Sequence, residues 1–443
     1  MRKLERRAVI CLLLAAVLIL GTGVFAYRFF RYGREWATYY GNGNVYDEGI
    51  LKSGRVYDRE DRLLAACGEG TIYYNDDWEI RCATVHAVGD PDGNIATGAL
   101  ASFRDSMIGY SPVFGTYRMR TGEGDCHLTL DAEACRTAYE YLAAYQAGCI
   151  GVYNYKTGEI LCMVSTPAFD PADPPAAGEE GEDGLYLNRF LSATMVPGST
   201  FKTVTSAAVI ENLPDYEDFT YYCEGTRWVG DEDLNCMHVH GEVDFEGALI
   251  SSCNGAYSVL TERLGAETMK IYAARTGMTA SYSVDGIETV PGSFDFPTDS
   301  VLNLGWAGIG QYHDQVNPCA MMIYMGAIAN GGKAALPHLL EKPRLLKKYT
   351  DQLLEARTAA KLTEMMRRDV TEGYGEGNFP GLALCAKTGT AEISGQDPTG
   401  WFCGFLDDPD HPLAFCCYVE NAGEGIVTAA PIVNAVLQEL VNQ

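Results

Sequence analysis

The sequence has few basic residues, and none of them forms a positively charged stripe in the body of the chain. Lysine and arginine number 33 against 59 aspartates and glutamates, which gives a net charge of -26 at neutral pH. Seven of the basic residues lie within residues 1–35. Because proteins that bind DNA or RNA neutralise phosphates with basic side chains, we expect no nucleic-acid partner.

Internal repeats and heptad runs are also absent, so nothing in the sequence indicates a repeat protein or a long coiled coil. The chain has 443 residues, of which 47% are hydrophobic and 21% are charged. A chain of this length and composition can bury a full-sized core. This excludes disorder as its global state and favours two or three domains.

One long uncharged run, residues 8–26, lies between two basic clusters near the N-terminus. A helix rises about 1.5 Å per residue, so this run nearly spans a hydrocarbon core of about 30 Å. We therefore expect a cytoplasmic tail at residues 1–7 and a transmembrane anchor at residues 8–26. A cleaved signal peptide is the alternative, although the run is long for one. The flanking charges favour a single-pass protein of the cell membrane with its acidic body outside the cytoplasm.

The remaining chain divides into two expected domains. Residues 27–148 show short β-like runs and turns, so we expect a small β-rich, non-catalytic domain there. Residues 149–443 show two strand candidates, a helical block, three more strand candidates and a final helix. This order predicts an α/β fold of the α+β type, an antiparallel five-stranded sheet flanked by helices with an inserted helical subdomain. The acidic and proline-rich segment 170–184 is predicted to be a surface loop.

A serine and a lysine, Ser199 and Lys202, stand at the predicted start of a helix that runs to about residue 211. On a helix this spacing places both side chains on one face, and the helix N-terminus adds partial positive charge beside the serine. A lysine whose pKa is lowered by burial can take the hydroxyl proton and make the serine a nucleophile. The pair alone is weak evidence, because Ser-x-x-Lys also arises by chance.

A second motif, Ser252 and Asn254 in the segment SSCN, offers a hydroxyl and an amide two residues apart. The hydroxyl can relay a proton and the amide can hold a substrate amide. The plainer interpretation is a capping turn, which is the commoner role of serine and asparagine at such places.

A third motif ends a late strand candidate and consists of Lys387, Thr388, Gly389 and Thr390. Such a strand can pair with an extended peptide, while the lysine attracts a carboxylate and the glycine permits close approach. Each motif is unspecific by itself. In this order and context, however, the three match the motif set of the serine penicillin-recognising enzymes.

The chain as a whole resembles the class B penicillin-binding proteins, especially the short forms related to penicillin-binding protein A. Besides the three motifs, residues 55–59 (RVYDR) are similar to the membrane-proximal signature of that family. Residues 157–161, 186–189, 308–311 and 316–318 add further matches. The resemblance implies a penicillin-binding transpeptidase fold and a serine-type D,D-transpeptidase that cross-links peptidoglycan and is acylated by β-lactams.

The resemblance also implies a role for each motif residue. Ser199 would attack the D-Ala-D-Ala carbonyl with Lys202 as general base, and Ser252 with Asn254 would complete the proton relay. Lys387, Thr388 and Thr390 would hold the substrate. The backbone N–H groups of Ser199 and Thr390 would form the oxyanion hole.

The partners implied by the resemblance are peptidoglycan stem peptides and β-lactam antibiotics. No glycosyltransferase domain fits into residues 27–148, so we expect a partner to polymerise the sugar chains. In this family that partner is a membrane glycosyltransferase of the shape, elongation, division and sporulation class. No cofactor is expected to be required for catalysis.

Four metal-competent residues, Cys223, Cys236, His240 and Cys253, lie within 31 residues in the pattern C-x12-C-x3-H-x12-C. Three thiolates and one imidazole suit a closed, structural zinc site, which would brace the segment SSCN. A disulfide between Cys223 and Cys236 is the alternative outside the cytoplasm. Free thiols are the third interpretation, and the sequence leaves all three open.

Two other functions remain as alternatives. A β-lactamase or D,D-carboxypeptidase would need a group that activates water against the acyl-enzyme, and no such glutamate can be assigned. The second alternative is a catalytically idle scaffold for a membrane glycosyltransferase. The intact set of Ser199, Lys202 and Lys387 argues against idleness.

Overall fold

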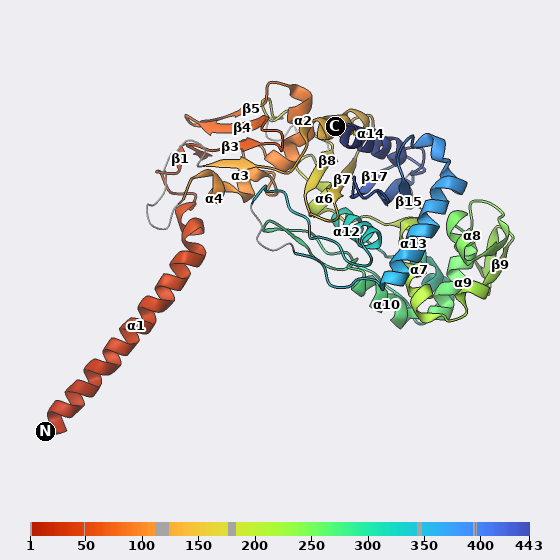
Figure 1. The fold of residues 1–443 in the computed structure, drawn as a ribbon, viewed down its shortest axis with the longest axis horizontal. Coiled ribbons are helices and arrows are strands. Elements are labelled where there is room, and N and C mark those ends of the chain that lie inside the picture. Colours follow the sequence, from red (N-terminus) through yellow and green to blue (C-terminus); the bar gives the residue numbers. More distant parts are fainter. Residues whose placement is uncertain are drawn as a thin grey trace.

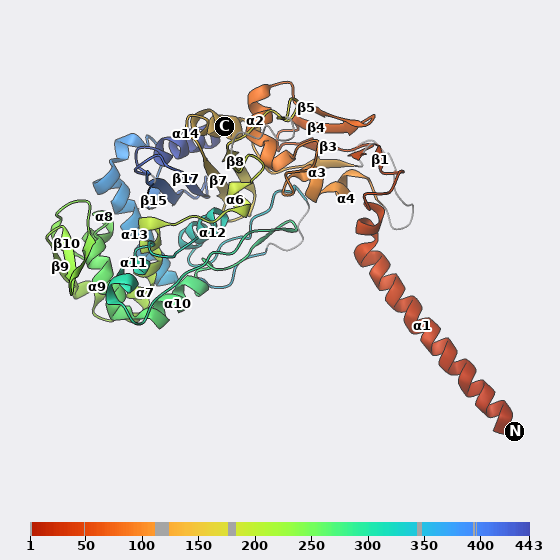
Figure 2. The same cartoon turned by 180° about the vertical axis from the view of Figure 1, so that it is seen from behind.

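A long helix, a small mixed sheet and a larger antiparallel sheet follow one another along the chain (Figures 1 and 2). They are seen in a computed structural model that describes residues 2–47, 49–110, 124–175, 183–342, 348–392, 395 and 397–443. Helix α1 (Arg2–Ala37) projects from the body, and its side chains are exposed along the apolar run. In the described part of the chain it alone is long and apolar enough to cross a membrane.

The first region of the body is built on a four-stranded sheet of order β5-β4-β3-β6, in which β3 and β6 are parallel. Its elements are β1 (Tyr46–Asp47), β2 (Ile50–Leu51), β3 (Arg55–Tyr57), β4 (Leu63–Gly68), β5 (Thr71–Tyr74), α2 (Trp78–Val88), α3 (Ala99–Ser102), α4 (Arg104–Met107) and β6 (Asp125–His127).

The segment RVYDR forms β3 and the turn after it. Arg55 binds the carboxylate of Asp125 through two hydrogen bonds of 2.8 Å, which joins β3 to β6. The buried carboxylate of Asp58 accepts the backbone N–H groups of Glu60 and Arg62. This segment therefore shapes the turn between β3 and β4.

The larger sheet is five-stranded and wholly antiparallel, with the order β15-β16-β17-β7-β8. Its strands are β7 (Gly148–Asn154), β8 (Ile160–Thr166), β15 (Leu384–Ala391), β16 (Thr399–Leu406) and β17 (Leu413–Val419). Every residue of β16 and β17 is buried, because helices cover both faces of the sheet. Such strands read as continuous apolar runs without alternation. The predicted five-stranded antiparallel sheet is confirmed.

Two layers of helices cover the sheet (Figure 1). Helices α5 (Ala132–Leu142) and α14 (Ala429–Val441) pack together on one face. Helices α12 (Pro318–Ala329) and α13 (Ala356–Arg368) pack on the other. Residues 318–328 of α12 are all buried, which explains why this helix is apolar on every side.

The chain between β8 and α12 forms the lobe inserted between the two halves of the sheet. Its helices are α6 (Arg189–Ser192), α7 (Lys202–Asn212), α8 (Phe245–Ile250), α9 (Asn254–Leu264), α10 (Ala266–Arg275) and α11 (Val301–Gly308). It also carries short hairpin strands: β9 (Thr220–Cys223), β10 (Thr226–Val229), β11 (Glu232–Asn235), β12 (Gly241–Asp244), β13 (Ser283–Val284) and β14 (Ile287–Glu288). The insertion is therefore mainly helical, with small hairpins at its surface.

The predicted surface loop 170–184 is only partly described, since residues 176–182 lie outside the described residues. At its start, Asp170 forms an ion pair of 2.6 Å with Arg81 of α2. This contact ties the beginning of the loop to the first region of the body.

Candidate active site

Ser199 lies on a 3-10 turn, Gly198–Phe201, that leads directly into α7. The predicted helix therefore begins as a tighter 3-10 turn. In this geometry residues three apart are eclipsed, so Ser199 and Lys202 point to the same side. The Lys202 Nζ lies 3.0 Å from the Ser199 Oγ.

Ser252 and Asn254 also contact the Lys202 side chain. Lys202 Nζ lies 3.0 Å from the Ser252 Oγ, 2.6 Å from the Ser252 carbonyl oxygen and 2.7 Å from the Asn254 Oδ1. Ser252 has a φ of 53°, in the left-handed region that non-glycine residues rarely occupy. In this conformation both oxygens of Ser252 face the lysine.

The environment of Lys202 suits a general base. The side chain is fully buried, and burial together with the positive charge of Lys387 lowers the pKa of Lys202 to about 7. An ordinary lysine stays protonated at this pH. Lys202 can therefore lose its proton near neutrality and accept one from a serine hydroxyl.

The motif of Lys387 to Thr390 lies inside β15, at one edge of the five-stranded sheet. Lys387 is fully buried, and its Nζ lies 3.2 Å from the Tyr374 hydroxyl and 3.4 Å from the Asp369 Oδ2. The Tyr374 hydroxyl also accepts the N–H of Thr388 at 2.9 Å. This places a fixed cation behind the strand and leaves Thr388 and Thr390 lining the cleft.

Two glycines allow β15 to lie against the turn that carries Ser199. A Cβ on Gly198 would stand 2.7 Å from the carbonyl oxygen of Thr390, and one on Gly389 would stand 2.7 Å from that of Pro197. Both distances are too short for any side chain. Close backbone packing of this kind fixes the serine turn relative to the strand.

Three hydrogen bonds support this packing. The Trp401 indole N–H donates to the carbonyl of Val196 at 2.9 Å, and the Gly198 N–H donates to the carbonyl of Gly310 at 2.8 Å. The Gln311 side-chain amide donates to the carbonyl of Thr390 at 3.2 Å. The segment GIGQ, which the resemblance singled out, therefore holds the serine turn against β15.

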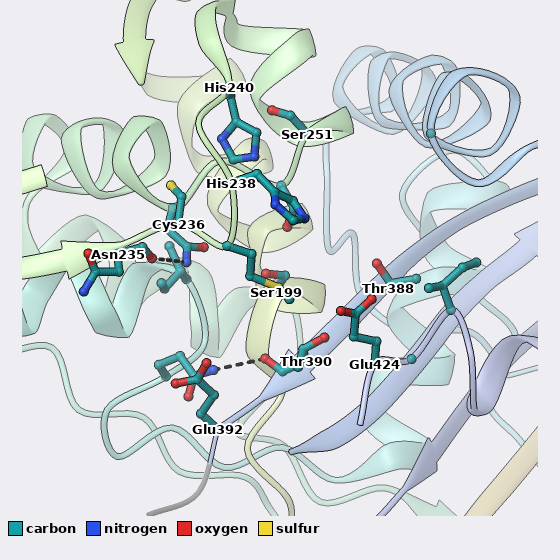
Figure 3. A pocket seen from close by; sticks show the side chains of 18 of the residues that line it. Ser199, Asn235, Cys236, His238, His240, Ser251, Thr388, Thr390, Glu392 and Glu424 are labelled. Carbon is teal, nitrogen blue, oxygen red and sulfur yellow. Dashed lines mark hydrogen bonds between the residues drawn. The ribbon is translucent and has the colours of Figure 1, made fainter. Parts of the chain in front are cut away.

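Ser199 opens into a cleft of 740 Å³ (Figure 3). Figure 3 shows Ser199 between the segment that carries His238 and His240 and the strand that carries Thr388 and Thr390. Among the described residues that line the cleft, the charged side chains are the carboxylates of Asp233, Glu392 and Glu424. The two lysines lie behind this lining.

The three cysteines and His240 form a compact cluster next to the cleft. Their ligand atoms all lie within 4.8 Å of one another. The Sγ of Cys236 lies 3.7 Å from that of Cys223 and 3.9 Å from that of Cys253, and the Cys223 Sγ lies 3.4 Å from the His240 Nδ1. A disulfide has an S–S length of about 2.0 Å, so the structure shows four separate ligand groups.

The structure thus brings together the predicted residues of all three motifs. Their catalytic and binding roles, including the oxyanion hole, stay predictions. Sequence reasoning missed Tyr374 and Asp369, which contact Lys387 from a π-helical turn after α13. No pattern in the sequence marks these two residues, because their importance depends on the turn that faces them toward β15.

The fold and the cluster of serine, lysines and amide define a serine-dependent acyl-transfer enzyme. The profile of the family described as penicillin binding protein transpeptidase domain matches residues 148–438. The chain belongs to this family.

Several known proteins are similar to the chain. The peptidoglycan D,D-transpeptidase PbpA of Mycobacterium tuberculosis is 29% identical over 346 residues, which cover 67% of this chain and 68% of the relative. Stage V sporulation protein D of Bacillus subtilis is 28% identical over 314 residues, 65% of this chain and 48% of the relative.

Solved structures share the fold. The D,D-transpeptidase domain of a peptidoglycan glycosyltransferase from Eggerthella lenta has a TM-score of 0.73 at 23% identity and covers 88% of this chain and 98% of its own. Penicillin-binding protein A of M. tuberculosis, in its ceftriaxone acyl-enzyme complex, has a TM-score of 0.71 at 22% identity. That match covers 87% of this chain and 97% of the other.

Proposed function

We propose that this chain is a peptidoglycan D,D-transpeptidase that cross-links stem peptides through an acyl-serine intermediate. One observation carries the proposal: the buried Lys202 ammonium lies within hydrogen-bond distance of Ser199, Ser252 and Asn254 at once. That arrangement supplies a nucleophile, a base and a proton relay in one cluster. The name of PbpA as a peptidoglycan D,D-transpeptidase supports the same activity.

The first half of the reaction forms the acyl-enzyme. Neutral Lys202 takes the hydroxyl proton while Ser199 Oγ attacks the carbonyl of the penultimate D-alanine. The peptide bond then breaks, and the terminal D-alanine leaves with a proton delivered through Ser252. Lys387, Thr388 and Thr390 hold the carboxylate of the leaving residue, because a cation and two hydroxyls on a strand edge suit that group.

The second half transfers the peptide to an amine of a neighbouring stem peptide. The amine nitrogen attacks the acyl-serine carbonyl and forms a new peptide bond. The bond to Ser199 breaks, and the proton released by the amine returns to Ser199 through the Lys202 and Ser252 cluster. β-Lactams would acylate Ser199 in the first half, as the acyl-enzyme structure of penicillin-binding protein A suggests for this fold.

The test is intact-mass spectrometry of residues 36–443 after brief exposure to benzylpenicillin, with Ser199→Ala as the control. We expect a stable adduct of one drug mass that is absent from the control. Consumed drug without an adduct would instead support the hydrolytic alternative. Intact drug without an adduct would support the idle scaffold.

We further propose that Cys223, Cys236, His240 and Cys253 hold a structural zinc ion. Zinc–sulfur bonds of about 2.3 Å at tetrahedral angles place two sulfur atoms about 3.8 Å apart. The S–S distances of 3.7 and 3.9 Å fit this spacing. Because Cys253 lies between Ser252 and Asn254, the metal would brace the segment that faces Lys202. It would supply no catalytic step.

The metal content of the purified protein tests the zinc proposal. We expect about one zinc per chain, by analogy with closed sites of three thiolates and one imidazole. A metal-free protein with four titratable thiols would support the free-thiol alternative. Protein that lacks the metal and has lost two of these thiols would support the disulfide.

We also propose that α1 anchors the chain as a single-pass membrane protein with the catalytic region outside the cytoplasm. The exposed apolar run of α1 and the extracytoplasmic location of peptidoglycan support this topology. Protease digestion of intact and permeabilised cells tests it, since the body should be cleaved in both. Digestion only after the cytoplasmic side is opened would contradict it.

The glycan strands would come from a separate membrane glycosyltransferase of the shape, elongation, division and sporulation class. This partner is proposed from the family resemblance. Cross-linked co-purification of the full chain from membranes would test it, with a variant lacking residues 27–110 as the control. Failure to recover any enzyme of that class would contradict the partnership.

A further inference from the structure

Asp369 is a fully buried carboxylate beside the catalytic cleft that the mechanism above does not use. It begins the π-helical turn Asp369–Tyr374, which directly follows α13. Lys387 and Tyr374 lie beside its carboxylate, and both favour its ionised form. A buried charge is costly unless an opposite charge compensates it, so the position of such a counter-ion decides what Asp369 does.

The counter-ion is Lys387. Its Nζ lies 3.4 Å from the Asp369 Oδ2, and both side chains are excluded from solvent. Tyr374, at the other end of the same turn, lies 3.2 Å from the same ammonium through its hydroxyl. π-Helical turns occur frequently at functional sites. Here the turn places a carboxylate and a hydroxyl around the buried lysine of β15, which lies behind the lining of the cleft.

Few other ionisable groups face this pair. Among the described residues they are Tyr374 on the same turn, Lys202 on α7 and Tyr257 on α9. Glu246 is engaged by Arg368 and Lys361 at the surface. Asp369 is therefore the buried carboxylate that compensates the charge of Lys387.

We propose that Asp369 is a positioning residue of the acyl-transfer site, which keeps the Lys387 ammonium charged and in place. Lys387 can then bind the substrate carboxylate and hold Lys202 in its neutral, proton-accepting form. This inference rests on the proposed function.

The two lysines respond in opposite ways to the same burial. Burial alone would lower the pKa of Lys387, but the charge of Asp369 and the Tyr374 hydroxyl outweigh it and raise that pKa above its ordinary value. No carboxylate of the described residues forms an ion pair with Lys202, and burial lowers its pKa to about 7. Burial also raises the pKa of Asp369, to about 6, against the effect of Lys387. Asp369 is therefore mostly ionised where Lys202 becomes neutral.

The test is the pH profile of acylation by a fluorescent penicillin in Asp369→Asn. Without the carboxylate, the buried Lys387 loses its proton at lower pH. We expect the alkaline limb of the profile to move down by about one pH unit or more, which is a tenfold change in the protonation equilibrium. Glu211→Gln is the matched control, since it removes another buried, paired carboxylate that lies on the far end of α7.

A slower Asp369→Asn enzyme with an unmoved alkaline limb would overturn the proposal, because a merely structural role lowers the rate without shifting the profile. If Asp369→Asn does not fold, the melting temperatures of Lys387→Met and of the double variant Lys387→Met/Asp369→Leu test the pairing instead. We expect the double variant to recover stability that the single variant loses. A double variant that melts no higher than Lys387→Met would overturn the pairing. Absence of acylation in the unmodified protein would instead contradict the proposed function.

Discussion

Lys202 and Lys387 are both fully buried beside the same cleft, yet their pKa values move in opposite directions. In the described structure the hydrogen-bond partners of Lys202 are neutral oxygens, whereas Lys387 faces the Asp369 carboxylate. The difference gives one lysine the protonation state of a base and the other that of a substrate-binding cation at the same pH.

The first prediction concerns pH. Lys202 must be neutral to accept the Ser199 proton, and it is protonated below its pKa of about 7. The rate of acylation by a fluorescent penicillin should therefore rise as the pH increases through about 7 and stay level until Lys387, whose pKa is raised, loses its proton in the alkaline limb. Lys202→Arg keeps the positive charge but cannot lose its proton in this range. It should be slower by about a hundredfold or more, the usual contribution of a general base, without the rise.

The second prediction concerns Gly198, whose φ of 55° and contact with Thr390 leave no room for a side chain. Gly198→Ala should destabilise the fold and slow acylation by about tenfold or more, since small displacements of reacting groups are costly. Gly230→Ala is the control, because Gly230 has a φ of 68° but open space around it. It should cost about 1–2 kcal/mol of stability and leave acylation unchanged. Equal acylation rates in the two variants would contradict this prediction.

The third prediction concerns the Tyr374 hydroxyl, which accepts the Thr388 N–H and contacts Lys387. Tyr374→Phe leaves both groups without that partner, at a cost of about 1–3 kcal/mol. Acylation should slow by about tenfold, measured as the second-order rate constant with benzylpenicillin. Tyr153→Phe removes a buried hydroxyl that has no hydrogen-bond partner in the described structure, so it should leave the rate unchanged and should not lower stability.

The fourth prediction separates two neighbouring histidines. His240→Ala removes a ligand of the proposed zinc site and should lower both the metal content and the melting temperature. His238→Ala should leave both unchanged, because its ring lies outside the four-residue cluster. The same loss of metal in both variants would argue that the site is not the one formed by His240.

Much of the fold could be predicted because buried strands and a segregated order of elements leave clear patterns. The five strands were expected from apolar runs, and the structure lengthens β15 to Leu384–Ala391, so that Lys387 and Thr390 lie within the strand. The hairpins of the inserted lobe were not expected. Their strands have only two to four residues and alternate little, so they resemble loops in sequence.

The contacts of the site could be predicted only where local spacing determines them. Ser199 and Lys202 belong to one turn, so three residues of sequence place them together. The contact between Lys387 and Asp369 joins separate elements. It depends on a π-helical turn that no local sequence pattern predicts. Contacts of the site between residues far apart in the sequence are therefore determined by tertiary packing, and local sequence patterns do not predict them.

Helix α1 continues without a break from the apolar run to Ala37, where the first region of the body begins. If the run crosses the membrane as proposed, the residues after it form a rigid rod about 16 Å long, at about 1.5 Å per residue. A rigid helix keeps the body of the protein at a fixed distance from the membrane, whereas a flexible linker would not. The layer of the cell wall in which this protein makes its bonds would then be set by the length of a helix, and each added turn would raise that layer by about 5.4 Å.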